Sequence, residues 1–79
     1  MAKGSKITSV DEHIAKRIRE RRKAIGMTLE ELAVEMRLTY QQVQKYEGAI
    51  NRVSASRLYD IARHLDVSVG YFFEGLPKK

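Results

Sequence analysis

The sequence of 79 residues contains no cysteine. Neither a disulfide nor a zinc site with cysteine ligands can therefore stabilise the fold. A chain of this length forms one domain with a modest core, too small for a second domain or a buried cofactor cavity. We expect helix packing to supply the stability and no cofactor to be bound.

Long apolar runs are also missing from the sequence. No stretch approaches the length needed to span a membrane, and the N-terminal MAKGSKITS lacks the apolar centre of a signal peptide. The sequence therefore predicts a cytoplasmic protein that does not contact a membrane.

Patterns that would support catalysis or metal binding are absent as well. No nucleophile and base can be paired with any specificity, and no glycine-rich loop suited to cradling phosphate is present. His13 and His64 have no partner at the spacing of metal ligands, so we expect both at the surface or its boundary. The sequence predicts no enzyme and no metal site.

The segment 28–47, TLEELAVEMRLTYQQVQKYE, has the pattern of two short helices separated by about three residues. Its apolar residues follow the helical period, with Leu29, Leu32, Ala33 and Met36 in the first helix and Val43 and Tyr46 in the second. Thr28 precedes Glu31 by three residues, and Thr39 precedes Gln42 by three, so each helix begins with a capping-box pattern. The small Ala33 permits close crossing and Leu38 fills the turn, which together predict a helix-turn-helix.

The second of these helices exposes a polar face formed by Tyr40, Gln41, Gln44 and Lys45. Glutamine amides at a helix N-terminus can hydrogen-bond to base edges in the major groove, which favours DNA reading. The alternative is an ordinary polar surface helix, because glutamine is a good helix former. Within a helix-turn-helix we prefer the first interpretation.

Further helices are expected on both sides of this motif. Ser9 and Glu12 form a capping-box pattern for a helix reaching Ile25, with Gly26 as its stop and an apolar face of Val10, Ile14, Ile18 and Ile25. After a turn in which Gly48 takes left-handed geometry, Ser54 caps a helix that ends near Asp66 and carries Leu58, Ile61, Ala62 and Leu65. Ser68 caps a last short helix with Val69, Phe72 and Phe73, closed by Gly75. The predicted organisation is a flexible basic arm at 1–8, an all-α domain of five helices at 9–76 and an unstructured tail at 77–79.

The formal net charge of +5 favours polyanions without identifying which one. Six basic residues lie between positions 16 and 23: Lys16, Arg17, Arg19, Arg21, Arg22 and Lys23. Cations near a helix C-terminus complement the helix dipole, which explains some of them. A phosphate-facing edge is the alternative explanation for the excess.

From Ile14 to Gly75 the chain resembles the phage-repressor and Cro-like helix-turn-helix family, also called the xenobiotic-response-element family. The matching pieces are IAKRIRERRKAIGMT, LEELAVEM, TYQQVQKYE, INRVSASRLYDIARHLDVS and YFFEG. The resemblance implies a compact lambda-repressor-like domain whose third helix lies in the major groove. It implies base contacts by Tyr40, Gln41 and Lys45, with Gln44 beside them. Phosphate contacts are expected from Arg17, Arg19, Thr28, Thr39, Asn51 and Arg52.

Three positions depart from the family pattern. Arg37 stands where a glycine is usual in the turn, so it would adopt positive φ at a cost of about 1 kcal/mol. Leu29 replaces a glutamine whose amide touches phosphate in similar proteins, so that contact is lost or moved to Thr28 and backbone N–H groups. At the exit of the third helix, the glycine is shifted by one residue to Gly48, before Ala49.

The resemblance also pairs Glu47 with Arg22 in a partly buried salt bridge between the first and third helices. The alternative is an exposed glutamate at a helix end.

The combined prediction is a sequence-specific transcription regulator that binds double-stranded DNA as a homodimer, at least on DNA, at an inverted repeat. It would be a repressor or an autoregulator. The alternative is an antitoxin-like module that chiefly holds a protein partner and binds DNA secondarily. A further domain could follow Lys79. The dimer interface is predicted at Tyr71, Phe72 and Phe73, with Phe72 as the residue expected in the core and Phe73 or Tyr71 as the contact to the partner.

Overall fold

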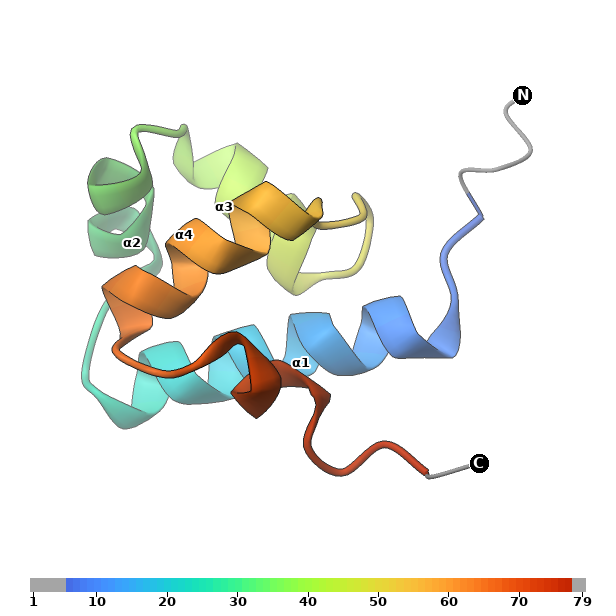
Figure 1. Cartoon of the computed structure of the whole chain (residues 1–79). Helices are drawn as coiled ribbons and strands as arrows, with labels where there is room; N and C mark the ends of the chain where they lie inside the picture. The colour runs from blue at the N-terminus through green and yellow to red at the C-terminus, as the bar shows by residue number, and fades with distance from the viewer. Residues whose placement is uncertain (1–5, 78–79) are drawn as a thin grey trace.

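A computed structural model describes residues 6–77, and within this range the protein is entirely helical without strands. The elements are α1 (Ser9–Ala24), α2 (Leu29–Met36), α3 (Tyr40–Glu47), α4 (Ala55–Leu65) and the 3-10 helix η2 (Val69–Phe73). Figure 1 shows α1 along one side of the molecule, with α2, α3 and α4 grouped on the other and the C-terminal segment against α1. The predicted all-α domain of five helices is confirmed, with the last of the five a 3-10 helix.

The starts of α2 and α3 are the capping boxes that the sequence predicts. The amide of Glu31 donates to Oγ1 of Thr28 over 3.0 Å, and the Thr28 amide donates back to Glu31 Oε1 over 2.8 Å. Thr39 and Gln42 repeat the arrangement at 3.1 and 3.0 Å. These reciprocal bonds satisfy amides that a helix leaves without partners at its first turn.

The start of α1 was predicted one residue too late. Thr8, not Ser9, is the N-cap, and its box partner is Asp11, not Glu12. Thr8 therefore belongs to the helical domain and not to an arm. Residues 6 and 7 of the predicted arm lie before the helix without secondary structure, whereas residues 1–5 of the arm and 78–79 of the predicted tail lie outside the described residues.

Three helix ends use left-handed backbone at residues other than glycine, and Asp66 does so at the end of α4 with φ 59°. Arg37 ends α2 with φ 58°, as its place in the turn predicts. After α3, however, Gly48 has φ −92° and Ala49 takes the left-handed position with φ 57°, so the geometry predicted for Gly48 is wrong. The left-handed residue thus lies one place after the glycine. Ala49 is strained there, because its Cβ is crowded in left-handed backbone geometry.

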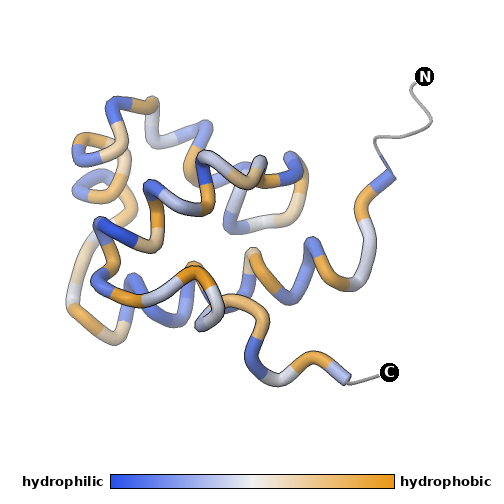
Figure 2. Tube along the Cα trace, in the orientation of Figure 1, coloured by the Kyte–Doolittle hydropathy of each residue, from blue (hydrophilic) through white to orange (hydrophobic). Residues whose placement is uncertain are grey.

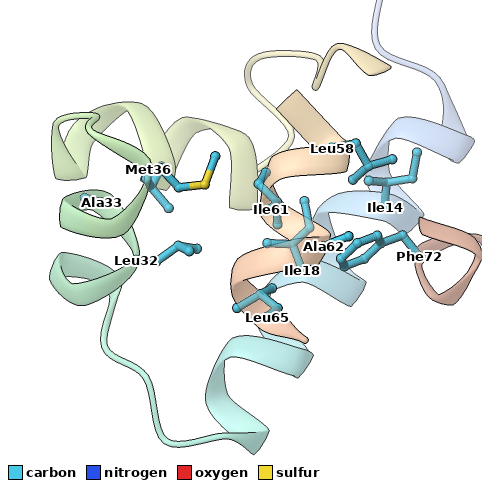
Figure 3. Packing of buried hydrophobic residues seen from close by; sticks show 11 residues of the cluster. Ile14, Ile18, Leu32, Ala33, Met36, Leu58, Ile61, Ala62, Leu65 and Phe72 are labelled. Atoms are coloured by element: carbon cyan, nitrogen blue, oxygen red, sulfur yellow. The ribbon is translucent and has the colours of Figure 1, made fainter. Parts of the chain in front are cut away.

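The core lies where α1, α2, α4 and η2 converge, as Figure 3 shows. Its buried apolar cluster consists of Ile14, Ile18, Leu32, Ala33, Met36, Val43, Leu58, Ile61, Ala62, Leu65 and Phe72. Ala33 is 3 % exposed, which agrees with its predicted place at the close crossing of α2 and α3. Val10 and Ile25, predicted on the buried face of α1, are 41 % and 40 % exposed, because they lie at the two ends of α1 beyond the central cluster.

The C-terminal segment is held by side chains of α1. Ser68 precedes η2 but makes no side-chain cap, contrary to the prediction. Instead, Arg17 donates two hydrogen bonds to the Tyr71 carbonyl oxygen at 3.0 and 3.2 Å, and His13 Nε2 lies 2.6 Å from the carbonyl oxygen of Glu74. The short helix is thus ordered by long-range contacts, which explains how a single 3-10 turn persists.

Candidate nucleic-acid interface

The outer face of α3 carries the four side chains predicted to contact bases. Tyr40 is 43 % exposed, and Gln41, Gln44 and Lys45 are exposed as well. On the inner face Val43 is buried and Tyr46 half-buried. No hydrogen bond or ion pair engages the side chains of the outer four within residues 6–77, whereas Gln42 is occupied in the capping box. These four side chains are therefore available to a ligand.

The inner end of α3 is fixed to α1 by the predicted pair of Arg22 and Glu47. Arg22 Nε donates to Glu47 Oε2 over 2.6 Å and Nη2 donates to Oε1 over 2.9 Å, which is a bidentate arrangement. The side chains are 9 % and 6 % exposed, so the alternative of an exposed glutamate is wrong. Arg22 Nη1 also donates to the carbonyl oxygen of Met27, which ties the α1–α2 turn to the same pair.

The electrostatics around Arg22 favour its charged form. The hydrogen bonds that Arg22 donates to the Glu47 carboxylate raise the pKa of Arg22, and burial opposes this only in part. The charges of Glu47 and Glu30 add to the upward shift. Arg22 is therefore a permanent cation whose charge is neutralised inside the protein, and it is not available to DNA.

The basic residues of α1 divide into internal and exposed groups. Arg17 bonds to the Tyr71 carbonyl oxygen and lies 3.9 Å from the centre of the Tyr71 ring, with Glu74 also 3.2 Å away. Arg21 Nε donates to the carbonyl oxygen of Leu65 over 2.8 Å, at the end of α4. The exposed group consists of Lys16, Arg19 and Lys23. The phosphate-facing edge, which was the alternative explanation for the six clustered cations, is therefore wrong for Arg17, Arg21 and Arg22.

Arg17 was expected to contact phosphate, and its guanidinium is instead committed to the C-terminal segment. Arg19 remains exposed, with no hydrogen bond or ion pair to another described residue. Its phosphate contact stays a prediction. The signal that sequence reasoning missed is the spacing of four between His13, Arg17 and Arg21, which places three donors on one stripe of α1 facing backbone carbonyls.

The remaining predicted phosphate contacts lie at helix starts and in the loop after α3. Thr28 and Thr39 use their hydroxyls as caps while staying exposed. Asn51 is exposed in the loop. Arg52 is 43 % exposed at its side chain, and donates to Asp11 over 3.1 Å and to the carbonyl oxygen of Lys6. A phosphate contact by Arg52 would have to compete with these bonds.

Asp11, which sequence reasoning overlooked, joins this loop to the start of α1. The Thr8 amide and hydroxyl donate to its carboxylate, and Arg52 adds a third donor. The hydrogen bond that the Thr8 backbone amide donates to Asp11 is the main cause that lowers the pKa of Asp11. Burial has a smaller, opposing effect. The Thr8–Asp11 spacing in the sequence was the available signal.

The three residues predicted for the dimer interface lie in different environments. Phe72 is 0 % exposed and packs in the core, as expected for it individually, so its assignment to the interface is wrong. Tyr71 is half-buried, with the Arg17 guanidinium over its ring and the Phe72 ring nearly perpendicular to it. Phe73 is 41 % exposed.

Neither histidine belongs to a metal site in the described part of the chain, where no group of three or more histidine, aspartate and glutamate residues could hold an ion. His13 contacts the C-terminal segment, and His64 Nδ1 lies 3.1 Å from the carboxylate of Glu35, linking α4 to α2. No helix among residues 6–77 is long and apolar enough to cross a membrane.

Two short helices are joined by a tight turn that contains a residue with left-handed backbone geometry, and the second helix has an exposed polar face. These features define the helix-turn-helix class of DNA-binding proteins. A helix-turn-helix family model matches residues 18–72. A transcriptional regulator in the ATPase CF(0) region of Rhodospirillum rubrum is 49 % identical over 72 residues, which are 91 % of this chain and 67 % of the relative. The chain belongs to the Cro/C1-type helix-turn-helix family of DNA-binding transcriptional regulators.

Solved structures agree with this membership. The restriction-modification controller protein C.AhdI from Aeromonas hydrophila is 27 % identical with a TM-score of 0.77, over 84 % of this chain and 100 % of that one. The biofilm master regulator SinR, solved in complex with DNA, is 29 % identical with a TM-score of 0.70, over 77 % of this chain and 98 % of that one. Hydroxypropylphosphonic acid epoxidase from S. wedmorenis also matches, at 25 % identity and a TM-score of 0.72, over 78 % of this chain but only 33 % of the enzyme.

Several relatives are longer than this chain. Two regulators from Sinorhizobium medicae and Rhizobium meliloti are 48 % identical over 68 residues, which are 86 % of this chain but 49 % of each relative. The chain therefore spans between about half and two thirds of the curated relatives it matches.

Proposed function

We propose that the chain reads a specific DNA sequence through α3, as a cytoplasmic repressor or autoregulator without enzymatic activity. The observation that carries the proposal is the outer face of α3, with Tyr40, Gln41, Gln44 and Lys45 exposed above a helix fixed from below by Arg22 and Glu47. A rigid helix that presents unpaired amide and ammonium donors suits base edges in the major groove. The DNA complex of the similar SinR supports the same use of the fold here.

The proposed complex is a homodimer on an inverted repeat, with the two copies of α3 about 34 Å apart. Phe73 is the contact that the exposure supports best, because Tyr71 is half-covered by Arg17 and Phe72 is buried. Anchoring to phosphate is assigned to Arg19, Thr28, Thr39, Asn51 and Arg52.

A protein-partner module has less support. Large apolar side chains are exposed on α2, in the loop after α3 and on α4, at Val34, Ile50 and Tyr59. Figure 2 shows apolar positions interleaved with polar ones along these segments. Apolar residues that are exposed singly are normal on protein surfaces, so they do not favour an antitoxin-like role.

The test separates base reading from anchoring. After a preferred site has been selected from random DNA, Gln41→Ala should cost about 1–3 kcal/mol on that site and little on a scrambled duplex of equal length. Gln42→Ala is the control, because the Gln42 side chain is occupied in the capping box. It should lower the melting temperature more than it changes the preference for the selected site. If Gln41→Ala weakens both duplexes equally, or neither, α3 does not read bases there and the protein-partner function takes first place.

A further inference from the structure

An open cavity of about 290 Å³ lies beside the outer face of α3, where α1 and the start of α2 approach it. Its walls are formed by Arg19, Arg22, Leu29, Gln44, Glu47 and Gly48. It is at the small end of the range for ligand pockets, and a single phosphate group is a better match to its size than a drug-sized molecule.

The charge inside the cavity is that of Arg19. Arg22 and Glu47 neutralise each other through their bidentate bonds, so this pair adds no net charge. Arg19 and Gln44 are both exposed, and neither makes a hydrogen bond or ion pair with another residue of the described chain. The cavity thus presents one free guanidinium and one free amide, which are donors that suit a phosphate oxygen.

The position of Gln44 on α3 differs from that of the other polar residues. Successive residues of a helix are rotated by about 100°, so Lys45 lies about 40° from Gln41 on one side and Gln44 about 60° on the other. Gln44 shares the cavity with two arginines of α1, which fixes the direction of that rotation toward α1. Gln41 and Lys45 therefore form one face, and Gln44 belongs to its α1 edge.

We propose that this cavity receives one backbone phosphate of the bound DNA, held by the guanidinium of Arg19 and the side-chain amide of Gln44. The inference rests on the proposed DNA binding and changes the role of Gln44 from reading a base to anchoring. Leu29 forms an apolar wall and offers no side-chain donor, so the two polar contacts come from α1 and α3.

The first experiment measures salt dependence. One phosphate contact contributes about 0.9 to the slope of log affinity against log salt. Arg19→Gln should therefore lower that slope by about 0.9, which corresponds to an affinity ratio between 50 and 200 mM salt that is about 3.5-fold smaller. Lys16→Gln removes an exposed charge from the same helix outside the cavity and should change the slope much less. Equal slopes for the two variants would overturn the proposal.

The second experiment tests Gln44. Gln44→Ala should weaken the selected and scrambled duplexes by the same factor, unlike Gln41→Ala. In the double variant Arg19→Gln, Gln44→Ala, the loss should be smaller than the product of the two single losses, because both residues bind one phosphate. A loss with Gln44→Ala on the selected duplex alone would assign it to a base and refute the cavity as its site.

Neutral methylphosphonate substitution identifies the phosphate directly. Scanning the selected duplex one phosphate at a time should give a position that weakens the wild-type protein but no longer affects Arg19→Gln. If every position acts equally on both proteins, the cavity does not hold a backbone phosphate. Failure of the Gln41 comparison, in contrast, removes the base reading and leaves this scan interpretable, so the two proposals fail separately.

Discussion

Removing the carboxylate of Glu47 should destabilise the domain by about 3 kcal/mol. In Glu47→Ala, Arg22 loses two of its three hydrogen bonds and keeps only the one to the carbonyl oxygen of Met27. The guanidinium remains charged in a position where its side chain is 9 % exposed. A buried charge left without its partner is the main source of the loss.

The size of the effect follows from the geometry. Two hydrogen bonds between charged groups, at about 1.5–3 kcal/mol each, set an upper limit of about 6 kcal/mol. The open cavity next to Arg22 lets water replace part of the lost solvation. This lowers the expectation to about 3 kcal/mol, at the low end for a broken buried pair.

Urea denaturation of the wild type and Glu47→Ala, followed by circular dichroism, measures the difference in their free energies of unfolding. For a domain of this size, 3 kcal/mol corresponds to a fall in Tm of roughly 12–24 °C. The matched control is Glu35→Ala, whose carboxylate pairs with His64 at the surface and is 53 % exposed. That control should cost less than about 1 kcal/mol.

A double variant tests whether the stranded charge causes the loss. Arg22→Leu combined with Glu47→Leu removes both charges and should recover much of the loss, because the penalty comes from the stranded guanidinium. If Glu47→Ala and Glu35→Ala lower the free energy of unfolding by the same amount, water solvates Arg22 freely and the pair does not fix α3 to α1.

Phe72→Ala should cost about 3–5 kcal/mol in urea denaturation because Phe72 is fully buried, whereas Phe73→Ser should leave monomer stability within about 0.5 kcal/mol and weaken self-association in sedimentation. The lowered pKa of Asp11 contributes stability above its unfolded pKa, and this contribution is lost as the pH falls below about 4, so wild type and Asp11→Asn should converge in acid melts. Ala49→Gly should raise Tm slightly by removing strain at φ 57°; an unchanged or lower Tm would place the strain elsewhere.

The elements that the sequence predicts correctly depend on contacts within a few residues. The boxes of Thr28 and Thr39 join residues three apart, so their pattern is complete in the sequence. At α1 two such patterns, Thr8–Asp11 and Ser9–Glu12, are offset by one residue. The structure contains Thr8–Asp11, and Asp11 also accepts from Arg52, 41 positions away. A contact at that distance is invisible to local pattern reading.

The roles of the basic residues in the candidate site could be predicted only in part. Family resemblance identifies Arg22 and Glu47 because the pair recurs with the motif. The spacing of four places Arg17 and Arg21 on one stripe of α1, but their partners could not be predicted, because these are main-chain carbonyls more than 40 residues away. Every residue has a carbonyl oxygen, so these partners leave no mark on the sequence.

The geometry of α1 explains how one basic helix can serve both stability and binding. Arg17 and Arg21 are four residues apart and so lie within about 40° of each other, on the side that faces Tyr71 and Leu65. Arg19 is two residues from each and lies about 160° away, where it borders the cavity beside α3. The clustered charges therefore separate into one stripe that holds the C-terminal segment and an opposite position that faces the recognition helix. Because Arg19 shares no hydrogen bond with Arg17 or Arg21 in the described chain, we expect its replacement to affect DNA binding while the stripe continues to hold the C-terminal segment.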